Sequence, residues 1–484
     1  MSIISIPFAI FFLIVALLYY AVPARLRIAV LLIAGYFFYA TWHWFYIPLL
    51  AGVTALFYLT GRRIAAAQTP AGKRAALIFG VVISLIVLFG FQYLNFFSQS
   101  FTGTRISSLI VPLGLSFYTF AGIGYLADVF RAQIPPETRP DRFAAFIAFF
   151  PTLTSGPIER AGRLIPQFDQ DADNPGRKPF DEAHATEALR LILWGAFKKL
   201  VIADRLAIYV NAVYNAPDQH NGMVLLIATL FYAFQLYADF SGYTDVAVGV
   251  ARLLGIDLID NFRQPYFSMS IRDFWNRWHI SLSTWIRDYM FMPLSRNSLR
   301  RTKGKYPRAI QAAANFIVMV LVGLWHGPSW TFVVWGALHG LYLSVESLLG
   351  LRVRDPRAPL PKKIFRTLLT FVLVTFAWVF FRANSLSDAG YILTHFADWN
   401  GGTEGIFTPF ESAVLLPATE FWLSLALIAV LLFADAVDFR RGLLATWRQQ
   451  HWALRWATYY GLGVAILFAF VYGASTQPFI YAQF

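Results

Sequence analysis

The chain contains no cysteine among its 484 residues. Thiol nucleophiles, cysteine-ligated zinc, haem attached through cysteine and disulfides are therefore all excluded. Charge is also scarce, because only 14% of the residues are Asp, Glu, Lys or Arg, whereas a soluble globular domain carries about 25%. The alternating strands that are typical of an outer-membrane barrel are missing as well. These absences favour a helical membrane protein.

Long apolar runs are what the sequence has in abundance, and 57% of its residues are hydrophobic. Runs near 20 residues recur along the chain, and a helix of that length crosses the roughly 30 Å hydrocarbon core of a bilayer. The sequence therefore predicts an all-α polytopic membrane protein with about 11–13 transmembrane helices. The first run lacks a basic region before it, so we expect a retained span rather than a cleaved signal peptide. We draw the spans at residues 4–22, 26–43, 45–61, 75–97, 108–130, 190–214, 222–240, 309–326, 329–349, 364–381, 419–437 and 456–473.

Lys and Arg gather on one side of this topology. Basic clusters lie at residues 25–27, 62–74, 131–178, 296–308, 352–366 and 440–455, whereas the opposite loops hold Arg105 and Arg382. The positive-inside rule makes the basic side cytoplasmic and places both termini outside. The formal net charge of +13 is then a property of the cytoplasmic face rather than a sign of nucleic-acid binding. The same face can also attract an anionic ligand such as a coenzyme A thioester.

The stretch GLWHGPSW, residues 323–330, places His326 between two apolar runs. An ionisable side chain at membrane depth is costly, so it is either satisfied by a structural partner or functional. Counted from Arg308, the helix has risen about 27 Å when it reaches His326. Gly327 and Pro328 then break it. Irregular backbone at that depth must be buried in protein or line a water-filled cavity.

The stretch 266–294, YFSMSIRDFWNRWHISLSTWIRDYMFMPL, is too charged for an ordinary span. Ser270 and Asp273 have the spacing of a capping box, and Asp273 can pair with Arg277 one turn later. We expect an amphipathic or re-entrant helix that carries His279 and ends at Pro293. For His279, a structural orienting role is the alternative to a chemical one. The candidate supporting residues here are Trp275, Arg277, Trp278 and Asp288.

Two carboxylates, Asp239 and Asp245, lie in the apolar stretch YADFSGYTDVAVG, residues 237–249. Carboxylates at such depth pair with cations or function directly. We expect pairing with Arg252, Arg277 or Arg287, and proton transfer is the alternative.

Together these segments resemble the membrane-bound O-acyltransferases, in particular the bacterial branch typified by the membrane subunit of alginate O-acetylation. The resemblance rests on RDFWNRWHISLSTWIRDYMFMPL and GLWHGPSWTFVVWGALHG, with YADFSGYTDVAVG, NFRQPYFSMS and FPTLTSGPIER upstream, in the family's order over roughly residues 110–350. It implies one integral-membrane domain over residues 1–484, with N-terminal spans 1–105, a catalytic core 106–350 and C-terminal spans 351–484. The implied fold is a ring of helices around a central tunnel.

The resemblance also implies that His326 matches the family's essential histidine and His279 the second histidine of this branch. Imidazole titrates near neutrality and can take a hydroxyl proton as the oxygen attacks a thioester. The indole N–H of Trp325 or Trp330, or a backbone N–H at the break, can stabilise the oxyanion. We expect no metal, because no cluster of metal ligands is apparent in the sequence. We expect no tightly bound cofactor either, because the donor, acetyl-CoA or another acyl thioester, is a substrate.

The implied acceptor is an exported polysaccharide of the alginate kind, reached through extracytoplasmic SGNH-like partner proteins. The implied location is the bacterial inner membrane, among its lipids, with no nucleic acid as partner. D-alanyl transfer to teichoic acid and peptidoglycan O-acetylation use the same chemistry and stay open. A transporter or flippase with His326 as proton relay is a more remote alternative.

The C-terminal stretch STQPFIYAQF resembles the aromatic tail of a small partner in the teichoic acid D-alanylation system. We hypothesise that Tyr481 briefly carries the acyl group. The alternative is that the tail docks its aromatic side chains at the membrane interface.

Overall fold

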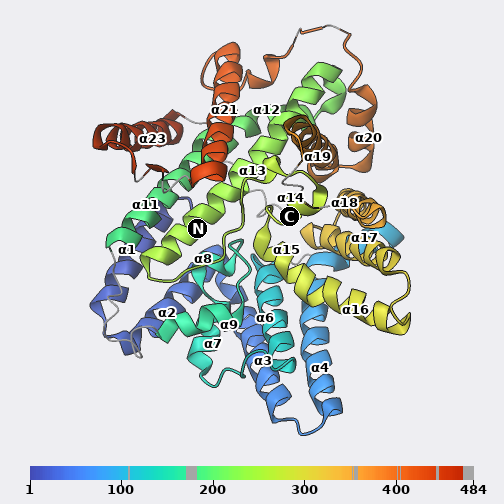
Figure 1. Cartoon of the computed structure of the whole chain (residues 1–484). Helices are drawn as coiled ribbons and strands as arrows, with labels where there is room; N and C mark the ends of the chain where they lie inside the picture. The colour runs from blue at the N-terminus through green and yellow to red at the C-terminus, as the bar shows by residue number, and fades with distance from the viewer. Residues whose placement is uncertain are drawn as a thin grey trace. The chain divides into compact units, whose positions relative to one another are not determined.

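In the computed structural model the chain is an assembly of helices (Figure 1), described at residues 1–106, 110–169, 182–351, 353, 358–400, 402–403, 405–442, 446–447 and 449–472. Every regular element in these ranges is helical, and eight segments are long and apolar enough to cross a membrane. The predicted class, an all-α polytopic membrane protein, is confirmed. Tyr481 lies outside the described residues.

The helices form two compact units. The first contains residues 1–192 and 244–260, and the second contains residues 193–243 and 261–484. Two long elements contribute to both units: α11 (Glu182–Phe197) and α13 (Gly222–Leu253). Residues 190–214, drawn as one span from the sequence, hold the end of α11, a π-helical segment at Lys198–Ala203 and α12 (Asp204–Tyr214).

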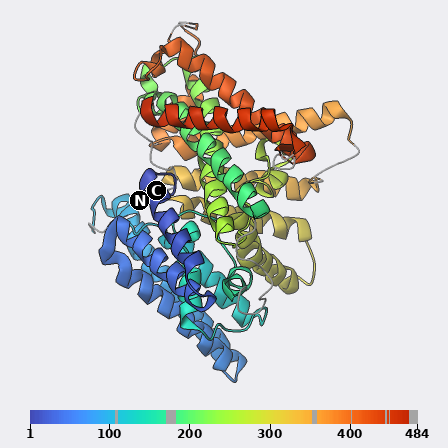
Figure 2. The same ribbon diagram turned by 90° about the vertical axis from the view of Figure 1, so that its left-hand side faces the viewer.

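The first unit is built from the N-terminal apolar runs. Its longer helices are α1 (Ile6–Ala21), α2 (Ala24–His43), α3 (Ile47–Ala66), α4 (Pro70–Leu88), α5 (Leu94–Thr102) and α6 (Leu115–Phe130). Figure 1 shows α3 and α4 as blue helices that run side by side, and Figure 2 shows the N-terminal helices in blue from another side. Short helices α7 (Pro140–Ile147), α8 (Phe150–Leu153) and α9 (Ala161–Leu164) follow. Phe149 and Phe150 there are fully buried, so the FPTLTSGPIER stretch belongs to the core of this unit.

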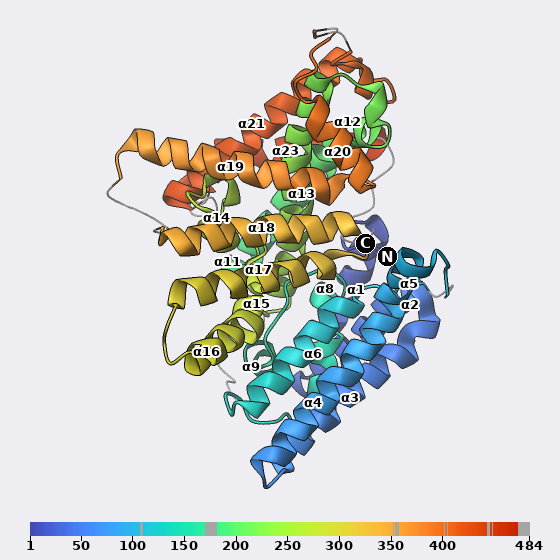
Figure 3. The ribbon, with the colours of Figure 1, turned by 90° about the vertical axis from the view of Figure 1, so that its right-hand side faces the viewer.

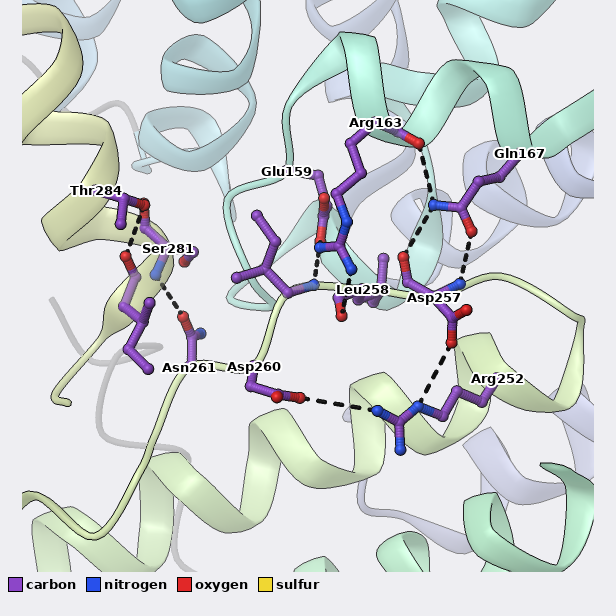
Figure 4. Close-up of polar contacts among 12 residues, drawn as sticks. Glu159, Arg163, Gln167, Arg252, Asp257, Leu258, Asp260, Asn261, Ser281 and Thr284 are labelled. Carbon is purple, nitrogen blue, oxygen red and sulfur yellow. Dashed lines mark hydrogen bonds and ion pairs between the residues drawn. The ribbon is translucent and has the colours of Figure 1, made fainter. Parts of the chain in front are cut away.

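A polar network in the first unit fixes the loop after α13 (Figure 4). The Glu159 carboxylate, 3% exposed, accepts the backbone N–H of Ile259 at 2.5 Å. The Arg163 guanidinium donates to the carbonyl oxygen of Leu258 at 3.2 Å. Burial raises the pKa of Glu159 to about 7, because desolvation disfavours the charged form. Leu258 and Ile259 are thus held by one side chain of the FPTLTSGPIER motif and one of α9, which follows it.

The second unit contains the longer helices that follow α13 in the chain. They are α16 (Met292–Arg301), α17 (Pro307–His326), α18 (Trp330–Leu349), α19 (Leu360–Arg382), α20 (Leu386–His395), α21 (Pro417–Arg441) and α23 (Trp452–Tyr472). The predicted spans 309–326, 329–349, 364–381, 419–437 and 456–473 therefore correspond to α17, α18, α19, α21 and α23. Figure 3 shows α17, α18 and α19 following one another as neighbouring helices.

The hairpin of α17 and α18 is packed through glycine (Figure 3). A Cβ on Gly323 would lie 2.2 Å from the carbonyl oxygen of Phe332, and a Cβ on Gly336 would lie 2.4 Å from that of Met319. Small residues of this kind let two membrane helices approach closely. Ser344 adds a hydrogen bond across the pair, because its hydroxyl donates to the carbonyl oxygen of Ala312 at 2.7 Å.

The segment 266–294 differs from its prediction. It is not one helix, because α14 (Ile271–Trp275) and α15 (Ile280–Ile286) are separated by a turn at residues 276–279. Pro293 does not end an element either. It lies in the first turn of α16, where the missing N–H of proline is tolerated. The predicted cap at Ser270 is confirmed, since its hydroxyl accepts the N–H of Asp273 at 3.0 Å.

We predict that Gly336→Ala destabilises the second unit by about 1–3 kcal/mol. The new methyl group would clash with backbone atoms of α17, which cannot move aside as a flexible side chain can. The unfolding temperature of the purified protein in detergent measures the effect. Gly461→Ala is the matched control, because a Cβ on Gly461 meets nothing within 4 Å. Equal unfolding temperatures for the two variants would refute the close packing of α17 on α18.

Candidate functional site

His326 is the last residue of α17, and the break that follows it is as predicted. Gly327 is extended, with φ 176°, and Ser329 caps α18 by accepting the N–H of Thr331 at 3.3 Å. His326 is only 4% exposed. Gly327 is buried as well, whereas Pro328 and Ser329 are partly exposed and Ser329 lines a cavity. Irregular backbone that is buried in protein or lines a cavity is what membrane depth allows.

Aromatic rings surround the His326 imidazole. Its centroid lies 4.9 Å from that of Trp325, 4.9 Å from that of Trp335 and 5.1 Å from that of Phe381. Trp335 comes from α18 and Phe381 from α19, so three consecutive long helices build the wall. Such packing limits the rotamers of the imidazole and fixes the direction of its nitrogens.

His279 lies at the turn between α14 and α15 in a left-handed conformation, with φ 45° and ψ 54°. The imidazole is fully buried, and its centroid lies 4.7 Å from the ring of Phe240 on α13. It lies 6.2 Å from the ring of Trp325, which in turn contacts His326. The structure therefore brings both predicted histidines to the same indole ring.

Asn261 holds the backbone on the far side of His279. Its carbonyl oxygen accepts the N–H of Ile280 at 3.0 Å, and its side-chain oxygen accepts the N–H of Ser281 at 3.1 Å. On the near side, the N–H of Arg263 donates to the carbonyl oxygen of Arg277 at 3.0 Å. Residues 261–263 thus clamp the turn, which explains how a non-glycine residue keeps a left-handed conformation that costs about 1–3 kcal/mol.

The other residues predicted on this segment separate into two groups. Arg277 pairs with Asp273 at 3.0 Å, as predicted, and both side chains are buried. Trp278 stacks on Phe274 at 5.5 Å, and Trp275 contacts Trp335 at 5.9 Å, so both support the aromatic wall. Asp288 instead pairs with the exposed Arg287 at 2.8 Å.

The two tryptophans considered as oxyanion donors also differ. Trp325 is buried beside both histidines, whereas Trp330, at the start of α18, is 46% exposed.

Asp239 is paired, but with a partner that the sequence prediction missed. Its carboxylate lies 2.6 Å from the ammonium of Lys199, which also lies 2.7 Å from Asp204. The expected partners pair with other carboxylates instead. Arg252 pairs with Asp257 and Asp260. Arg277 pairs with Asp273, and Arg287 pairs with Asp288. Asp245, further along α13, is half-buried and belongs to the first unit.

A third histidine, His339, was not singled out from the sequence. It is fully buried on α18, and neither ring nitrogen has a hydrogen-bonding partner among the described residues. Its ring lies 5.0 Å from that of Trp335 and 5.3 Å from that of Trp275. The signal that could have found it is simply a histidine inside a predicted span, in the stretch WGALHG.

Two cavities flank His326 in the second unit. One, of about 480 Å³, follows α17 from Gln311 to Val322 and includes Trp275, Arg272 and Arg287 in its lining. The other, of about 430 Å³, begins just past the break at Ser329 and includes Phe332, Phe381 and Arg382. Because Val322 precedes His326 by one turn and Ser329 follows it by three residues, the imidazole lies between the two cavities along the chain.

Comparison of the sequence with known proteins agrees with this arrangement of the site. A match to the membrane-bound O-acyltransferase (MBOAT) family covers residues 140–387, and the chain belongs to that family. It is therefore a membrane-bound O-acyltransferase, and it spans the membrane several times.

Its relatives transfer acyl groups to different polymers, according to their names. The chain is 39% identical over 397 residues to the probable alginate O-acetylase AlgI of Azotobacter vinelandii, covering 79% of this chain and 75% of that one. It is 34% identical over 401 residues to the peptidoglycan O-acetyltransferase of Helicobacter pylori, covering 77% and 74%. It is 31% identical over 306 residues to the teichoic acid D-alanyltransferase of Bacillus subtilis, covering 62% and 75%.

We predict that Asn261→Ala lowers the turnover number about ten- to a hundredfold, because a small displacement of a reacting or orienting group is enough for such a loss. Asn261→Asp keeps an acceptor for the Ser281 N–H at a helix start, where a carboxylate is favoured, and should restore most of the rate. Initial rates of acyl transfer at saturating substrate measure both variants. Asn400→Ala, at an exposed asparagine, is the control. If the Asp variant is as slow as the Ala variant, Asn261 does not act by positioning His279.

Proposed function

We propose that the protein transfers an acetyl group from a cytoplasmic thioester to hydroxyl groups of an exported polysaccharide, with His326 as the general base. The observation that carries the proposal is the position of His326, which is buried at a helical break between two cavities. The similarity to an alginate O-acetylase over most of the chain supports acetyl as the group and a polysaccharide as the acceptor.

The proposed reaction needs one proton transfer and one displacement. The imidazole of His326 takes the proton of the acceptor hydroxyl while the oxygen attacks the thioester carbonyl carbon. The carbon–sulfur bond breaks, and the thiolate leaves with the proton that the imidazolium returns. Because the chain has no cysteine, no thioester forms on the protein itself. Trp325 lies against the same imidazole and is the better placed of the two predicted indole donors for the oxyanion.

The charges in the two cavities support an assignment of donor and acceptor. The cavity along α17 includes Arg272 and Arg287 and starts near the basic end of that helix. Cations there suit the phosphates of acetyl-CoA or of a carrier-protein arm. Under the positive-inside rule this end faces the cytoplasm, and the cavity past the break faces outward in the bacterial inner membrane. Delivery to a polymer outside the cell favours an extracytoplasmic partner protein, as expected from the sequence.

His279 has an orienting role in this proposal. Its ring lies beside that of Trp325, which contacts His326, and we assign to it the position of the indole and the local field rather than receipt of the hydroxyl proton.

Peptidoglycan O-acetylation is a second candidate. The similarity to the Helicobacter pylori enzyme favours it specifically, and the chemistry at His326 would be unchanged. The two candidates differ only in which polymer gains the ester.

We predict that His326→Ala lowers O-acetylation of one polymer by about 10²–10⁴-fold, the usual contribution of a general base. Ester-linked acetyl is measured separately in exported polysaccharide and in peptidoglycan, in the wild type, the deletion strain and the variant, with the membrane level of the protein checked by immunoblot. His451→Ala, at an exposed histidine, is the control. Acetylation at the wild-type level by a normally inserted His326→Ala protein would rule out the general base, and the fraction that loses acetyl identifies the acceptor.

A further inference from the structure

His339 is a buried polar group to which the acyl transfer described above gives no task. It lies within α18 and is 0% exposed. Neither of its ring nitrogens has a hydrogen-bonding partner among the described residues. Nearly all buried polar side-chain atoms in proteins have such a partner, and an ionisable side chain inside a membrane-spanning helix is by default a functional one. His339 is therefore a candidate for binding a ligand.

The imidazole of His339 lies at the level of the cavity along α17, which we assigned above to the donor. Gly336, three residues before His339, packs against Met319 of α17, and Met319 lines that cavity. Leu343, one turn after His339, lines it as well. Trp275 is a third residue of the lining, and its ring centroid lies 5.3 Å from the imidazole. His339 thus lies one side chain behind the cavity wall.

The same imidazole is close to the reaction centre. The centroid of the Trp335 ring lies 5.0 Å from that of His339 and 4.9 Å from that of His326, so one indole ring separates the two imidazoles. Trp275 contacts Trp335 at 5.9 Å. His339, Trp275 and Trp335, here called the His339 cluster, therefore form a continuous group between the donor cavity and His326.

The His339 cluster offers one hydrogen-bond acceptor and several donors. A neutral imidazole has one N–H and one acceptor nitrogen, whereas an indole has only its N–H. The indole N–H groups of Trp275 and Trp335 are buried and, like the imidazole, have no partner among the described residues. A ligand that matches this set presents a carbonyl oxygen together with one N–H, as an amide does. A thioester alone has no N–H.

The thioester donor carries such an amide close to its sulfur. Acyl thioesters on coenzyme A and on carrier proteins share the same phosphopantetheine arm, in which two methylene groups separate the sulfur from the first amide. These methylene groups are apolar and suit a passage between aromatic rings. With the thioester carbonyl beside His326, the amide lies a short distance back toward the donor cavity, which is where the His339 cluster is found.

We propose that His339 binds the first amide of the donor's phosphopantetheine arm. Its acceptor nitrogen receives the amide N–H, and the indole N–H groups of Trp275 and Trp335 donate to the amide carbonyl oxygen. Since His339 is fully buried, the arm reaches it as the Trp275 indole turns aside, a side-chain movement of a kind common at binding sites. His339 is then a positioning residue that holds the thioester in front of His326. The assignment rests on the proposed function for the identity of the donor.

Binding of an unreactive donor analogue tests this subsite without any transfer. The probe is S-acetonyl phosphopantetheine, in which a methylene group between sulfur and carbonyl prevents transfer. Its counterpart has the first amide replaced by an ester, which keeps the carbonyl oxygen but lacks the N–H. Purified protein in nanodiscs is titrated calorimetrically with both. We expect the wild type to bind the amide about tenfold more tightly than the ester, because the ester leaves the acceptor nitrogen of His339 unpaired.

Variants of His339 and of one neighbour assign the preference to the imidazole. His339→Phe keeps a ring but no acceptor, and it should bind the two analogues equally. His339→Gln keeps an acceptor oxygen and should retain part of the preference. Tyr342→Phe is the matched control, because the Tyr342 ring lies 5.8 Å from the imidazole and the change removes only a hydroxyl. Unfolding temperatures are recorded for each variant, and His339→Leu replaces a Phe variant that does not fold.

Two results would overturn the proposal. One is equal binding of the two analogues by the wild type, a comparison that needs no variant. The other is a His339→Phe protein that binds both analogues more weakly but keeps the wild-type preference, because that is the effect of lost packing alone.

The outcomes for binding and for transfer are separable. Acetyl transfer by a wild-type protein that shows no preference for the amide would leave the proposed function standing and remove the subsite. A preference that depends on His339, in a protein that transfers no acetyl group, would do the reverse.

Discussion

The close packing of α17 on α18 is the constraint on which the rest of the site depends. Gly323 and Gly336 let the two helices approach until their backbones touch, and the chain can then turn between them inside the protein. His326 lies at that turn, at the end of a helix rather than along its side. It follows Val322, which lines one cavity, and precedes Ser329, which lines the other, so it lies between the two cavities along the chain. A continuous helix would have buried the same side chain against a neighbour.

Aromatic side chains pack around the imidazole of His326, hold it rigidly and exclude water from it. Trp325, Trp335 and Phe381 enclose the imidazole, and Trp325 joins it to His279. Charges stay further out. Lys199 and its two carboxylates line one cavity, and Arg272 and Arg287 line the other. Electrostatic interactions in such a water-poor centre are stronger than in water, which suits a reaction that develops charge on an oxygen and on an imidazole.

Local rules account for what the sequence predicted correctly. The apolar runs, the break after His326, the cap at Ser270 and the Asp273–Arg277 pair all depend on residues within one or two helical turns. The errors concern distant partners. Lys199, the partner that was missed, lies 40 residues from Asp239 in the chain. The bend at His279 is imposed by Asn261 and Arg263 rather than by any breaker in its own segment, so residues 266–294 were wrongly predicted as one helix.

The central claim is that His326 acts as the general base in acyl transfer from a donor on the basic side of the membrane to an acceptor on the other side. The most direct measurement uses proteoliposomes with labelled acyl thioester added outside and polysaccharide acceptor enclosed inside. For protein molecules inserted with their basic face outward, the account predicts ester-linked label on the enclosed acceptor for the wild type and none above background for His326→Ala. Labelling of the enclosed acceptor by the His326→Ala protein at the wild-type rate would contradict it, as would wild-type transfer that requires donor and acceptor on the same side.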